Sequence, residues 1–298
     1  MKKLLDKLID GAVLDSEDWV EHLIEAHEKA PGMSPEAFSS YSTSAGVNSY
    51  EFLLQGLASL KDSAPGNLNV QAIDLACGDG HLLGYLLPKL GPRASVHGVD
   101  MSESELAHAK KNFTDSRITF HCAKAQKLPI LDNSIDFILC HMAFMLMLPI
   151  EPVVQELSRV LKKGGQFAAV IGRKTQHEDL FKEIQTIVFQ FIDSRYPVLR
   201  KLRTGDVRVF SKDGLNKIFS ADIGFSGVES YDEFDLKVLT TPDGIWEFMK
   251  NMYFVGMLPE SDRTVLRAQL LKLGTENTNS QGKVFFDFPM TRFVVKKS

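Results

Sequence analysis

The sequence has 298 residues, 44% of them hydrophobic, which is enough apolar surface for one large domain or two small ones. Its net charge of -4 excludes the strongly basic surface by which many proteins bind nucleic acid or anionic membranes. No apolar stretch reaches the ~18 residues of a transmembrane helix, and Asp6, Lys7 and Asp10 interrupt any signal-peptide core.

Cysteine usage indicates the compartment. Cys77, Cys122 and Cys140 cannot all pair, and each lies in or beside a predicted apolar strand. Scattered thiols of this kind are typical of reduced intracellular proteins rather than of disulfide frameworks. They lack the spacing of metal ligands, and no histidine pair supplies that spacing, so no metal site is expected. We therefore expect a cytoplasmic protein.

The first 64 residues are predicted to form helices that precede a sheet. Apolar residues recur at helical spacing over residues 4–9 and 19–27, and a third helix is expected over residues 49–60. Tyr41 lies between these helices in a small polar segment. Pro65-Gly66-Asn67 is a typical turn sequence and marks the boundary with the next segment.

Residues 72–100 form the segment around which the rest of the chain is organised. A short apolar run that ends at Asp74 predicts a buried parallel strand, and an amphipathic run over residues 82–90 predicts a helix. The turn at residues 77–80 joins the two, and a second apolar strand ends at Asp100. This order is typical of the nucleotide-binding half of a doubly wound α/β sheet.

The turn restricts the kind of nucleotide. Gly78 and Gly80 leave the backbone free to approach a ligand closely. Leu83 replaces the third glycine of a dinucleotide fingerprint, and the P-loop sequence is absent. The carboxylates of Asp74 and Asp79 lie near the turn without a lysine or arginine in it. Such a site suits a ligand with an ammonium and a sulfonium better than one with a pyrophosphate.

The string acid-x-small-x-Gly-x-Gly at residues 74–80 resembles the first motif of the class I S-adenosylmethionine-dependent methyltransferases. The resemblance continues in family order through Leu128-Pro129, Asp136 and Gly164-Gly165, over about residues 70–172. The chain is thus similar to the small-molecule, type-11 branch of that family. The resemblance implies S-adenosylmethionine as cofactor and S-adenosylhomocysteine as product.

The resemblance also implies roles for single residues. Asp74 and the turn backbone would hold the methionine portion, Asp100 would hold the ribose, and Met101 would pack on the adenine. In the family, an aspartate in the loop after the third strand usually holds the adenine amine, but Lys124 occupies its place here. Adenine recognition would then rest on the backbone near Ala125 and on Gln126. The implied cofactor-binding set is Asp74, Ala76, Cys77, Gly78, Gly80, Asp100, Met101, Ala125, Gln126 and His141.

His141, directly after the predicted fourth strand, is the candidate catalytic residue. A sulfonium is already an activated leaving group, so the protein mainly has to align the reactants and exclude water, and a general base is optional. Two interpretations of His141 stay open: a base, or a residue that packs or contacts the cofactor. The apolar string at residues 142–147 is either core or the wall of an acceptor pocket.

Strands and helices alternate through residue 171, which predicts a parallel sheet with right-handed crossovers. The remainder is predicted to add helices, a sixth strand and a terminal strand that pairs antiparallel with the sixth as its edge partner. The helices are expected over residues 178–195, 211–219, 241–253 and 260–273, and the strands over 225–231 and 285–296.

Candidate acceptor-binding residues are Tyr41, Met145, Arg200, Trp246 and Tyr253. The basic cluster between residues 195 and 208 allows two interpretations. It is either the solvated end of a helix or a dock for an anionic acceptor through Arg200 or Arg203.

We predict an α/β fold, a doubly wound seven-stranded mixed sheet of Rossmann-like, class I methyltransferase type. One integrated domain would comprise a helical cap (1–64), a cofactor-binding core (65–172) and a C-terminal part with inserted helices (173–298). The expected reaction is in-line methyl transfer to an O, N or C nucleophile of a small molecule, without nucleic-acid or membrane partners.

Two alternatives remain. One is a catalytically silent S-adenosylmethionine-binding protein that acts as a sensor or partner, which Lys124 and the lack of an obvious base keep open. The other is a nicotinamide-dependent oxidoreductase, which Leu83 disfavours.

Overall fold

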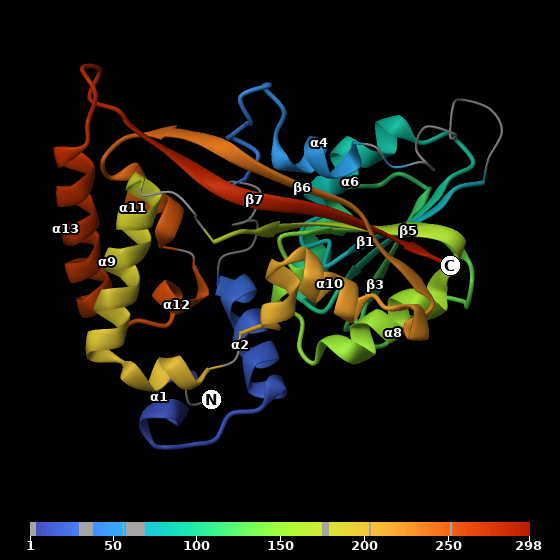
Figure 1. The fold of residues 1–298 in the computed structure, drawn as a ribbon, viewed down its shortest axis with the longest axis horizontal. Helices are drawn as coiled ribbons and strands as arrows, with labels where there is room; N and C mark the ends of the chain where they lie inside the picture. The colour runs from blue at the N-terminus through green and yellow to red at the C-terminus, as the bar shows by residue number, and fades with distance from the viewer. Residues whose placement is uncertain are drawn as a thin grey trace.

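The computed structural model describes residues 4–29, 38–55, 57, 69–174, 179–202, 204–250 and 252–298. Its centre is a seven-stranded sheet with the order β3-β2-β1-β4-β5-β7-β6 (Figure 1). Strands β1 to β5 pair in parallel, and β7 pairs antiparallel with both β5 and β6. The strands are β1 (Gln71–Leu75), β2 (Ser95–Asp100), β3 (Ile118–Cys122), β4 (Ile135–His141), β5 (Leu161–Gly172), β6 (Phe225–Thr240) and β7 (Val284–Lys297). The predicted fold class is confirmed.

The last two strands differ from the prediction. β7 lies between β5 and β6, so β6 and not the terminal strand forms this edge of the sheet. Both strands are also longer than expected, because their pairing continues to Thr240 and Val284 although β5 ends at Gly172. Apolar side chains recur at every second position from Phe234 to Val238, and Leu236 and Val238 are buried. This alternation is typical of a strand, but the predicted strand ended at residue 231.

The N-terminal helices are α1 (Leu4–Ile9), α2 (Ser16–Lys29) and α4 (Ser49–Leu54). α4 begins with a capping box: the Asn48 side chain accepts from the Glu51 N–H, and the Glu51 carboxylate accepts from the Asn48 N–H. α4 ends earlier than predicted, since Gln55 has an extended backbone. The predicted boundary at residues 65–67 lies outside the described residues.

The helices of the parallel half are α6 (His81–Leu86), α7 (Glu103–Asn112) and α8 (Ile150–Val160), and α6 begins within one residue of the helix predicted over residues 82–90. α6 continues into a 3-10 turn over Leu87–Lys89, because Pro88 cannot donate an α-helical hydrogen bond. Ser102 caps α7 by accepting from the Glu105 N–H.

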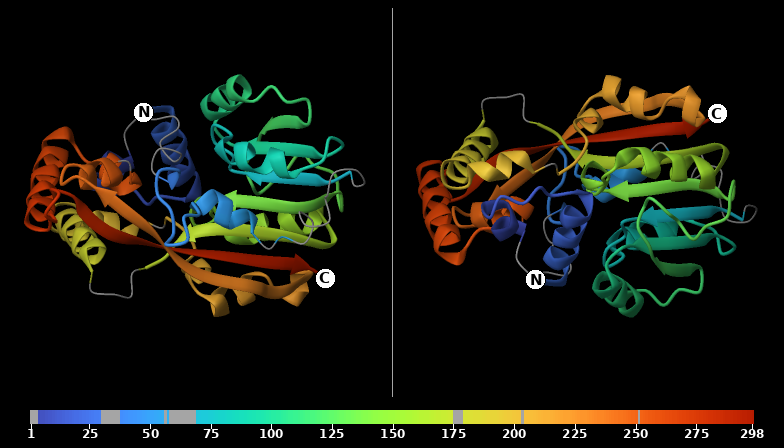
Figure 2. Two further views of the ribbon diagram at one scale, coloured as in Figure 1. Left: turned by 90° about the horizontal axis from the view of Figure 1, so that it is seen from above. Right: turned by 90° about the horizontal axis from the view of Figure 1, so that it is seen from below.

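Inserted helices follow β5 and β6: α9 (Leu180–Arg195), α10 (Lys212–Ile218), α11 (Gly244–Met249), α12 (Tyr253–Gly256) and α13 (Glu260–Glu276). The single helix predicted over residues 241–253 is in fact α11 and α12, because Met252 is extended and interrupts the helical backbone. Figure 2 shows α9 and α13 together beside the ends of β6 and β7 that extend past the parallel sheet.

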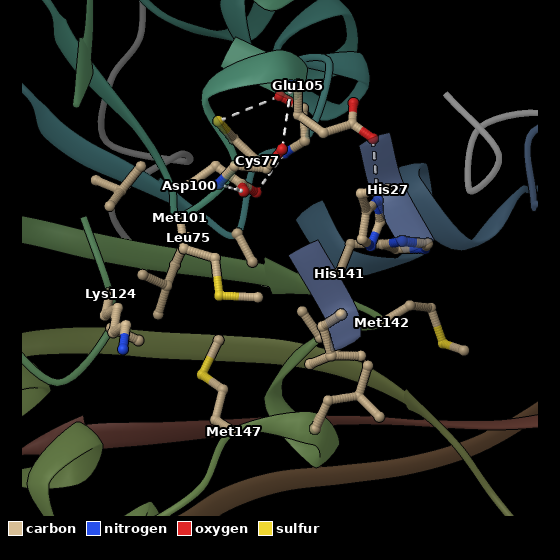
Figure 3. A pocket seen from close by; sticks show the side chains of 18 of the residues that line it. His27, Leu75, Cys77, Asp100, Met101, Glu105, Lys124, His141, Met142 and Met147 are labelled. Atoms are coloured by element: carbon tan, nitrogen blue, oxygen red, sulfur yellow. Dashed lines mark hydrogen bonds and ion pairs between the residues drawn. The ribbon is translucent and has the colours of Figure 1, made fainter. Parts of the chain in front are cut away.

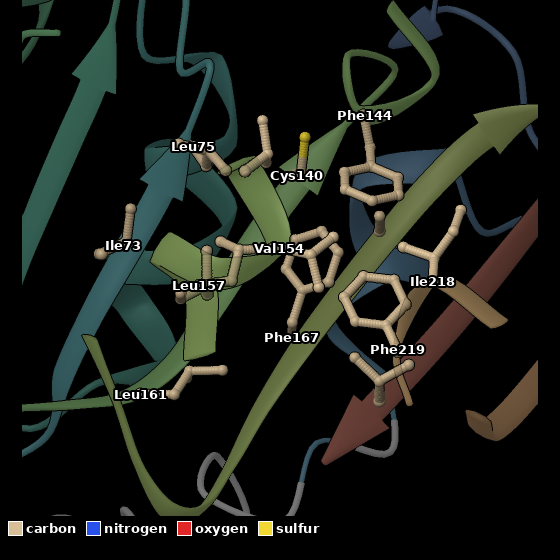
Figure 4. Packing of buried hydrophobic residues seen from close by; sticks show 14 of the residues in the cluster. Ile73, Leu75, Cys140, Phe144, Val154, Leu157, Leu161, Phe167, Ile218 and Phe219 are labelled. Atoms are coloured by element: carbon tan, nitrogen blue, oxygen red, sulfur yellow. The ribbon is translucent and has the colours of Figure 1, made fainter. Parts of the chain in front are cut away.

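Three hydrophobic clusters organise the packing. One face of the sheet packs on α8 and α10 around Phe144, Phe167 and Phe219 (Figure 4). The other face packs on α4 and α6. The third cluster lies beside the extended part of β6 and β7 and joins α1 and α2 to α9, α11 and α13. The N-terminal helices α1 and α2 therefore share a core with the C-terminal insertions. Among the described residues, no helix combines the length and apolarity needed to cross a bilayer.

Candidate functional site

A pocket opens at the carboxyl ends of β1, β2 and β4, where ligands bind in open α/β sheets (Figure 3). It encloses about 1180 Å³ of atom-free space, part of which is open solvent. The turn after β1 and the residues that end β2 and β4 form one side, which we call the floor. The apolar face of α2, together with Tyr253 of α12, forms the opposite side, which we call the cover.

The floor rests on a strained turn after β1. Ala76 and Gly78 have φ of 55° and 52°, in the left-handed region that only glycine enters readily. Gly80, with φ of 86°, is the N-cap residue before α6, and a Cβ there would lie 2.9 Å from the Phe113 ring. Gly80 therefore shapes the turn and is not among the pocket-lining residues, and its place in the cofactor-binding set stays a prediction.

Asp100 ties the end of β2 to this turn. Its Oδ2 accepts from the Gly78 N–H at 2.9 Å, and its Oδ1 accepts from the Ser102 N–H at 2.8 Å. Burial raises the pKa of Asp100, while these two N–H groups oppose the rise. Each carboxylate oxygen can accept a further hydrogen bond, so Asp100 can hold the turn and still contact a ligand.

Asp74 is the most buried acid of the floor. It is 1% exposed, and its Oδ2 has no hydrogen-bond partner among the described residues. Burial first, and then the neighbouring Asp100 and Asp79, raise the pKa of Asp74 to about 8. A buried carboxylate with an unused oxygen is costly unless a ligand supplies a donor or a positive charge. The acidic side chains on this side of the pocket therefore fit a cationic ligand that donates hydrogen bonds.

His141 ends β4 with its ring stacked on Tyr50, at 3.8 Å between ring centroids. Its Nε2 is 2.9 Å from the Ser49 hydroxyl. Burial, with a smaller effect from His81, lowers the pKa of His141 to about 3. An imidazole with so low a pKa is a weak proton acceptor at neutral pH, which favours the packing interpretation over the general base.

The loop after β3 borders the pocket through Lys124, Ala125 and Gln126. Lys124 forms an ion pair with Glu17 of α2. The Gln126 side-chain amide donates to the Leu148 carbonyl at 2.9 Å, so it fixes the loop after β4 in place. Lys124, the residue that departs from the family pattern, thus joins this loop to the cover through its ion pair with Glu17.

The string at residues 142–147 supplies both core and pocket wall. Phe144 is fully buried in the aromatic cluster below the sheet. Met142, Leu146 and Met147 line the pocket, whereas Met145 packs against the core. Met142 has φ of 54°, a second strained residue at a strand end that borders the pocket.

Most predicted acceptor-binding residues lie elsewhere. Tyr41 packs against Phe248 at 5.9 Å between centroids, and Trp246 is buried in the third cluster. The Arg200 side chain is mostly exposed and pairs with Asp193 at 2.9 Å, as expected of a solvated helix end. With Met145 in the core, Tyr253 is the predicted acceptor residue that lines the pocket. Arg203 lies outside the described residues.

The site contains residues that sequence reasoning did not assign to it. His27 of α2 and Glu105 of α7 both line the pocket, with His27 Nδ1 and Glu105 Oε1 2.9 Å apart. The second ring nitrogen of His27 is 3.1 Å from the Tyr253 hydroxyl. A histidine on an otherwise apolar helix stripe was the available signal, but its partners come from segments far apart in the chain.

Comparisons with known proteins place this site in context. Residues 73–169 match a family model described as a methyltransferase domain. The malonyl-(acyl-carrier protein) O-methyltransferase of Marinomonas sp. is 35% identical over 94 residues, which are 31% of this chain and 34% of that protein. The demethylmenaquinone methyltransferase of Staphylococcus aureus is 30% identical over 135 residues, 44% of this chain and 54% of that protein.

These matches span about a third to a half of the length of the curated relatives. Among solved structures, the YcgJ protein from Bacillus subtilis superposes with a TM-score of 0.53 at 17% sequence identity, over 80% of this chain and 96% of that chain. At this identity, the similarity establishes the fold alone. All the matched residues of the family model lie in the parallel half of the sheet, which carries the floor of the pocket.

Proposed function

We propose that this chain, which belongs to the class I S-adenosylmethionine-dependent methyltransferases, transfers a methyl group from that cofactor to an O, N or C nucleophile of a small molecule. The observation that carries the proposal is the Asp74 carboxyl group, buried beside the strained turn with one oxygen that has no partner within the described ranges of the chain. A cofactor with an ammonium and a sulfonium supplies the positive charge that this carboxylate needs.

The other floor residues fit the same cofactor. Asp100 has acceptor capacity left for ribose hydroxyls. Met101 and Ala125 offer apolar surface to an adenine, although no acidic side chain stands at position 124 for its amine. We assign the nucleoside to this end of the pocket, and the methionine portion to Asp74 and the turn.

S-Adenosylmethionine supplies a methyl group on an activated leaving group. The protein's own residues bind, orient and exclude water. Val20, Leu23 and Ile24 of the cover and Met142 and Met147 of the wall give the rest of the pocket an apolar lining. His141 stays neutral and does not serve as the base in this proposal, because its pKa is about 3.

The acceptor is proposed by class only. The apolar wall suits a small molecule with a substantial hydrophobic part. The two named relatives are a malonyl-(acyl-carrier protein) O-methyltransferase and a demethylmenaquinone methyltransferase, and they differ in acceptor. We therefore leave the methylated atom as O, N or C.

Binding and transfer test the proposal separately. Calorimetry with S-adenosylhomocysteine is expected to give saturable binding. Labelled S-adenosylmethionine is expected to transfer its methyl group to a member of a panel of hydrophobic hydroxyl, amine and activated-carbon acceptors. Binding of NAD without binding of S-adenosylhomocysteine would instead support the oxidoreductase.

A silent S-adenosylmethionine-binding protein is the second candidate. The observation in its favour is that His141, the candidate base, is a weak proton acceptor, because burial lowers its pKa to about 3. This alternative predicts cofactor binding without transfer to any acceptor, including thiols and amines that need no base at high pH.

A further inference from the structure

Glu105 is a buried acid that the proposed function has not used. It lies in the first turn of α7 and is 2% exposed. Its Oε1 faces His27 Nδ1 at 2.9 Å, whereas its Oε2 has no hydrogen-bond partner among the described residues. Figure 3 shows Glu105 joined to His27 beside Asp100. The unused oxygen therefore belongs to a side chain that is held in one place.

Glu105 Oε2 lies close to the turn that forms part of the floor. A Cβ built on Gly78 would lie 3.9 Å from Glu105 Oε2, so this oxygen lies just above the turn. The N–H of the same glycine donates to Asp100 Oδ2 at 2.9 Å. Glu105 and Asp100 thus approach one glycine from two elements, and both line the pocket.

The two carboxylates differ in what they already accept. Each Asp100 oxygen accepts a backbone N–H, whereas Glu105 Oε2 accepts no hydrogen bond from the part of the chain that the structure describes. A buried acceptor without a partner is destabilising, and a ligand hydroxyl relieves that cost. A ribose offers two adjacent hydroxyl donors, which matches two neighbouring carboxylates better than one.

We propose that Glu105 is a second ribose ligand, whose Oε2 accepts a hydrogen bond from a ribose hydroxyl of the cofactor while His27 holds Oε1. This inference rests on the proposed cofactor. It adds to Asp100 a contact that the sequence motifs do not contain.

The hold on Glu105 comes from the cover. The proposal assigns the proton of His27 to Nδ1, which then donates to Glu105 Oε1. Burial raises the pKa of Tyr253, with added effects of Asp100 and Glu105, so its hydroxyl remains a donor. The Tyr253 hydroxyl, 3.1 Å away, then donates to His27 Nε2. The hydrogen bonds from Tyr253 of α12 to His27 of α2, and from His27 to Glu105, hold the Glu105 carboxyl group in place. His27 is therefore a positioning residue.

A hydroxyl-deletion cycle tests the proposal. The dissociation constants of S-adenosylhomocysteine and its 2′-deoxy and 3′-deoxy analogues are measured on the wild type and on Glu105→Ala. The variant should bind S-adenosylhomocysteine about 5- to 100-fold more weakly, the range for an unpaired polar group. The wild type should discriminate against one deoxy analogue by a similar factor, and the variant should not.

Glu103→Ala is the matched control. Glu103 is exposed in the same first turn of α7 and does not line the pocket, so its removal takes away the same charge without the contact. It should leave affinity and discrimination unchanged. Should Glu105→Ala fail to fold, a crystal structure of the wild type with S-adenosylhomocysteine decides, with Oε2 expected within about 3.0 Å of a ribose hydroxyl.

The outcomes separate the two proposals. A wild type that binds no S-adenosylhomocysteine overturns the proposed function itself. Normal binding with equal discrimination by wild type and Glu105→Ala, or an Oε2 far from the ribose, overturns only the Glu105 assignment. The Glu105 assignment is also overturned if Glu105→Ala keeps its discrimination against the deoxy analogues and instead loses discrimination against an analogue that lacks the amino group.

The positioning role of His27 has its own readout. His27→Leu removes the donor to Glu105 and should reduce the discrimination between S-adenosylhomocysteine and the deoxy analogue. His27→Gln keeps a side-chain N–H and should restore part of that discrimination. A role limited to packing predicts that neither variant changes the discrimination, whatever it does to stability.

Discussion

The floor and the cover of the pocket are built by different means. The floor is local: a turn between β1 and α6 is held by Asp100, and all of it lies within residues 73–169 that match the methyltransferase domain. The cover is assembled from α2 and α12, outside that range and far apart in the chain, and packs through Trp19 and Tyr253. Polar contacts thus define the side that would hold the cofactor, and apolar packing defines the side that would close over it.

The largest expected effect is on the cover. Trp19 is 1% exposed and packs edge-on against Tyr253 and stacked against Phe254. Trp19→Ala should cost about 3–5 kcal/mol of local stability, because it removes a large buried side chain. Amide hydrogen exchange should accelerate in α2 and α12 while β1 and β4 keep their protection.

Exposed Glu28 at the end of α2 provides the control, and Glu28→Ala should leave exchange nearly unchanged. If Trp19→Ala accelerates exchange equally in the strands, floor and cover form one cooperative unit and the comparison fails.

The next effect concerns the floor. Asp100→Ala frees the Gly78 N–H and removes the proposed ribose acceptor. It should weaken S-adenosylhomocysteine binding by about 1–3 kcal/mol in calorimetry. Asp100→Asn keeps one acceptor oxygen and should show a smaller loss. An unchanged dissociation constant in both variants would mean that the cofactor does not use this carboxylate.

The pH dependence of the ligand-free protein tests the buried acid of the floor. Burial and neighbouring acids raise the pKa of Asp74 from 3.8 to about 8. Between these values the folded protein holds a proton that the unfolded chain has lost, so this group makes unfolding free energy rise as pH falls from about 8 toward 4. Its contribution is at most about 1.4 kcal/mol per pH unit.

Asp74→Asn removes this contribution. The variant should be more stable than the wild type at pH 8, and the difference should shrink as the pH is lowered, as followed by urea denaturation. It should also bind S-adenosylhomocysteine more weakly. Parallel stability curves for the two proteins across this range would show that Asp74 is ionised in the folded state.

The smallest effect is expected where floor and cover meet at the surface. The side chains of Lys124 and Glu17 are 43% and 66% exposed, and such ion pairs contribute less than about 1 kcal/mol. Lys124→Met should change cofactor affinity by that amount at most, and only at low salt. A larger, salt-independent loss in calorimetry would indicate that Lys124 contacts the cofactor directly.

The fold was predictable where local pattern and tertiary environment agree. The central parallel strands β4 and β5 contain continuous apolar runs, at residues 137–140 and 167–171, as expected of strands that are buried on both faces. The place of β7 between β5 and β6 was not predictable, because two antiparallel strands of similar pattern pair equally well in either order. Likewise the length of β6 depends on β7, which pairs with it from more than forty residues away.

For the site, the sequence by itself determined the turn and the acids that end the first strand pair, since glycine spacing and strand ends are local properties. Only the tertiary structure decided which residues face them. His27, Glu105 and Tyr253 meet because three separate elements pack together, whereas Tyr41, Arg200 and Trp246 are directed elsewhere by the helices and loops that carry them. A side chain's direction depends on the packing of its element, and that packing is a property of the whole chain.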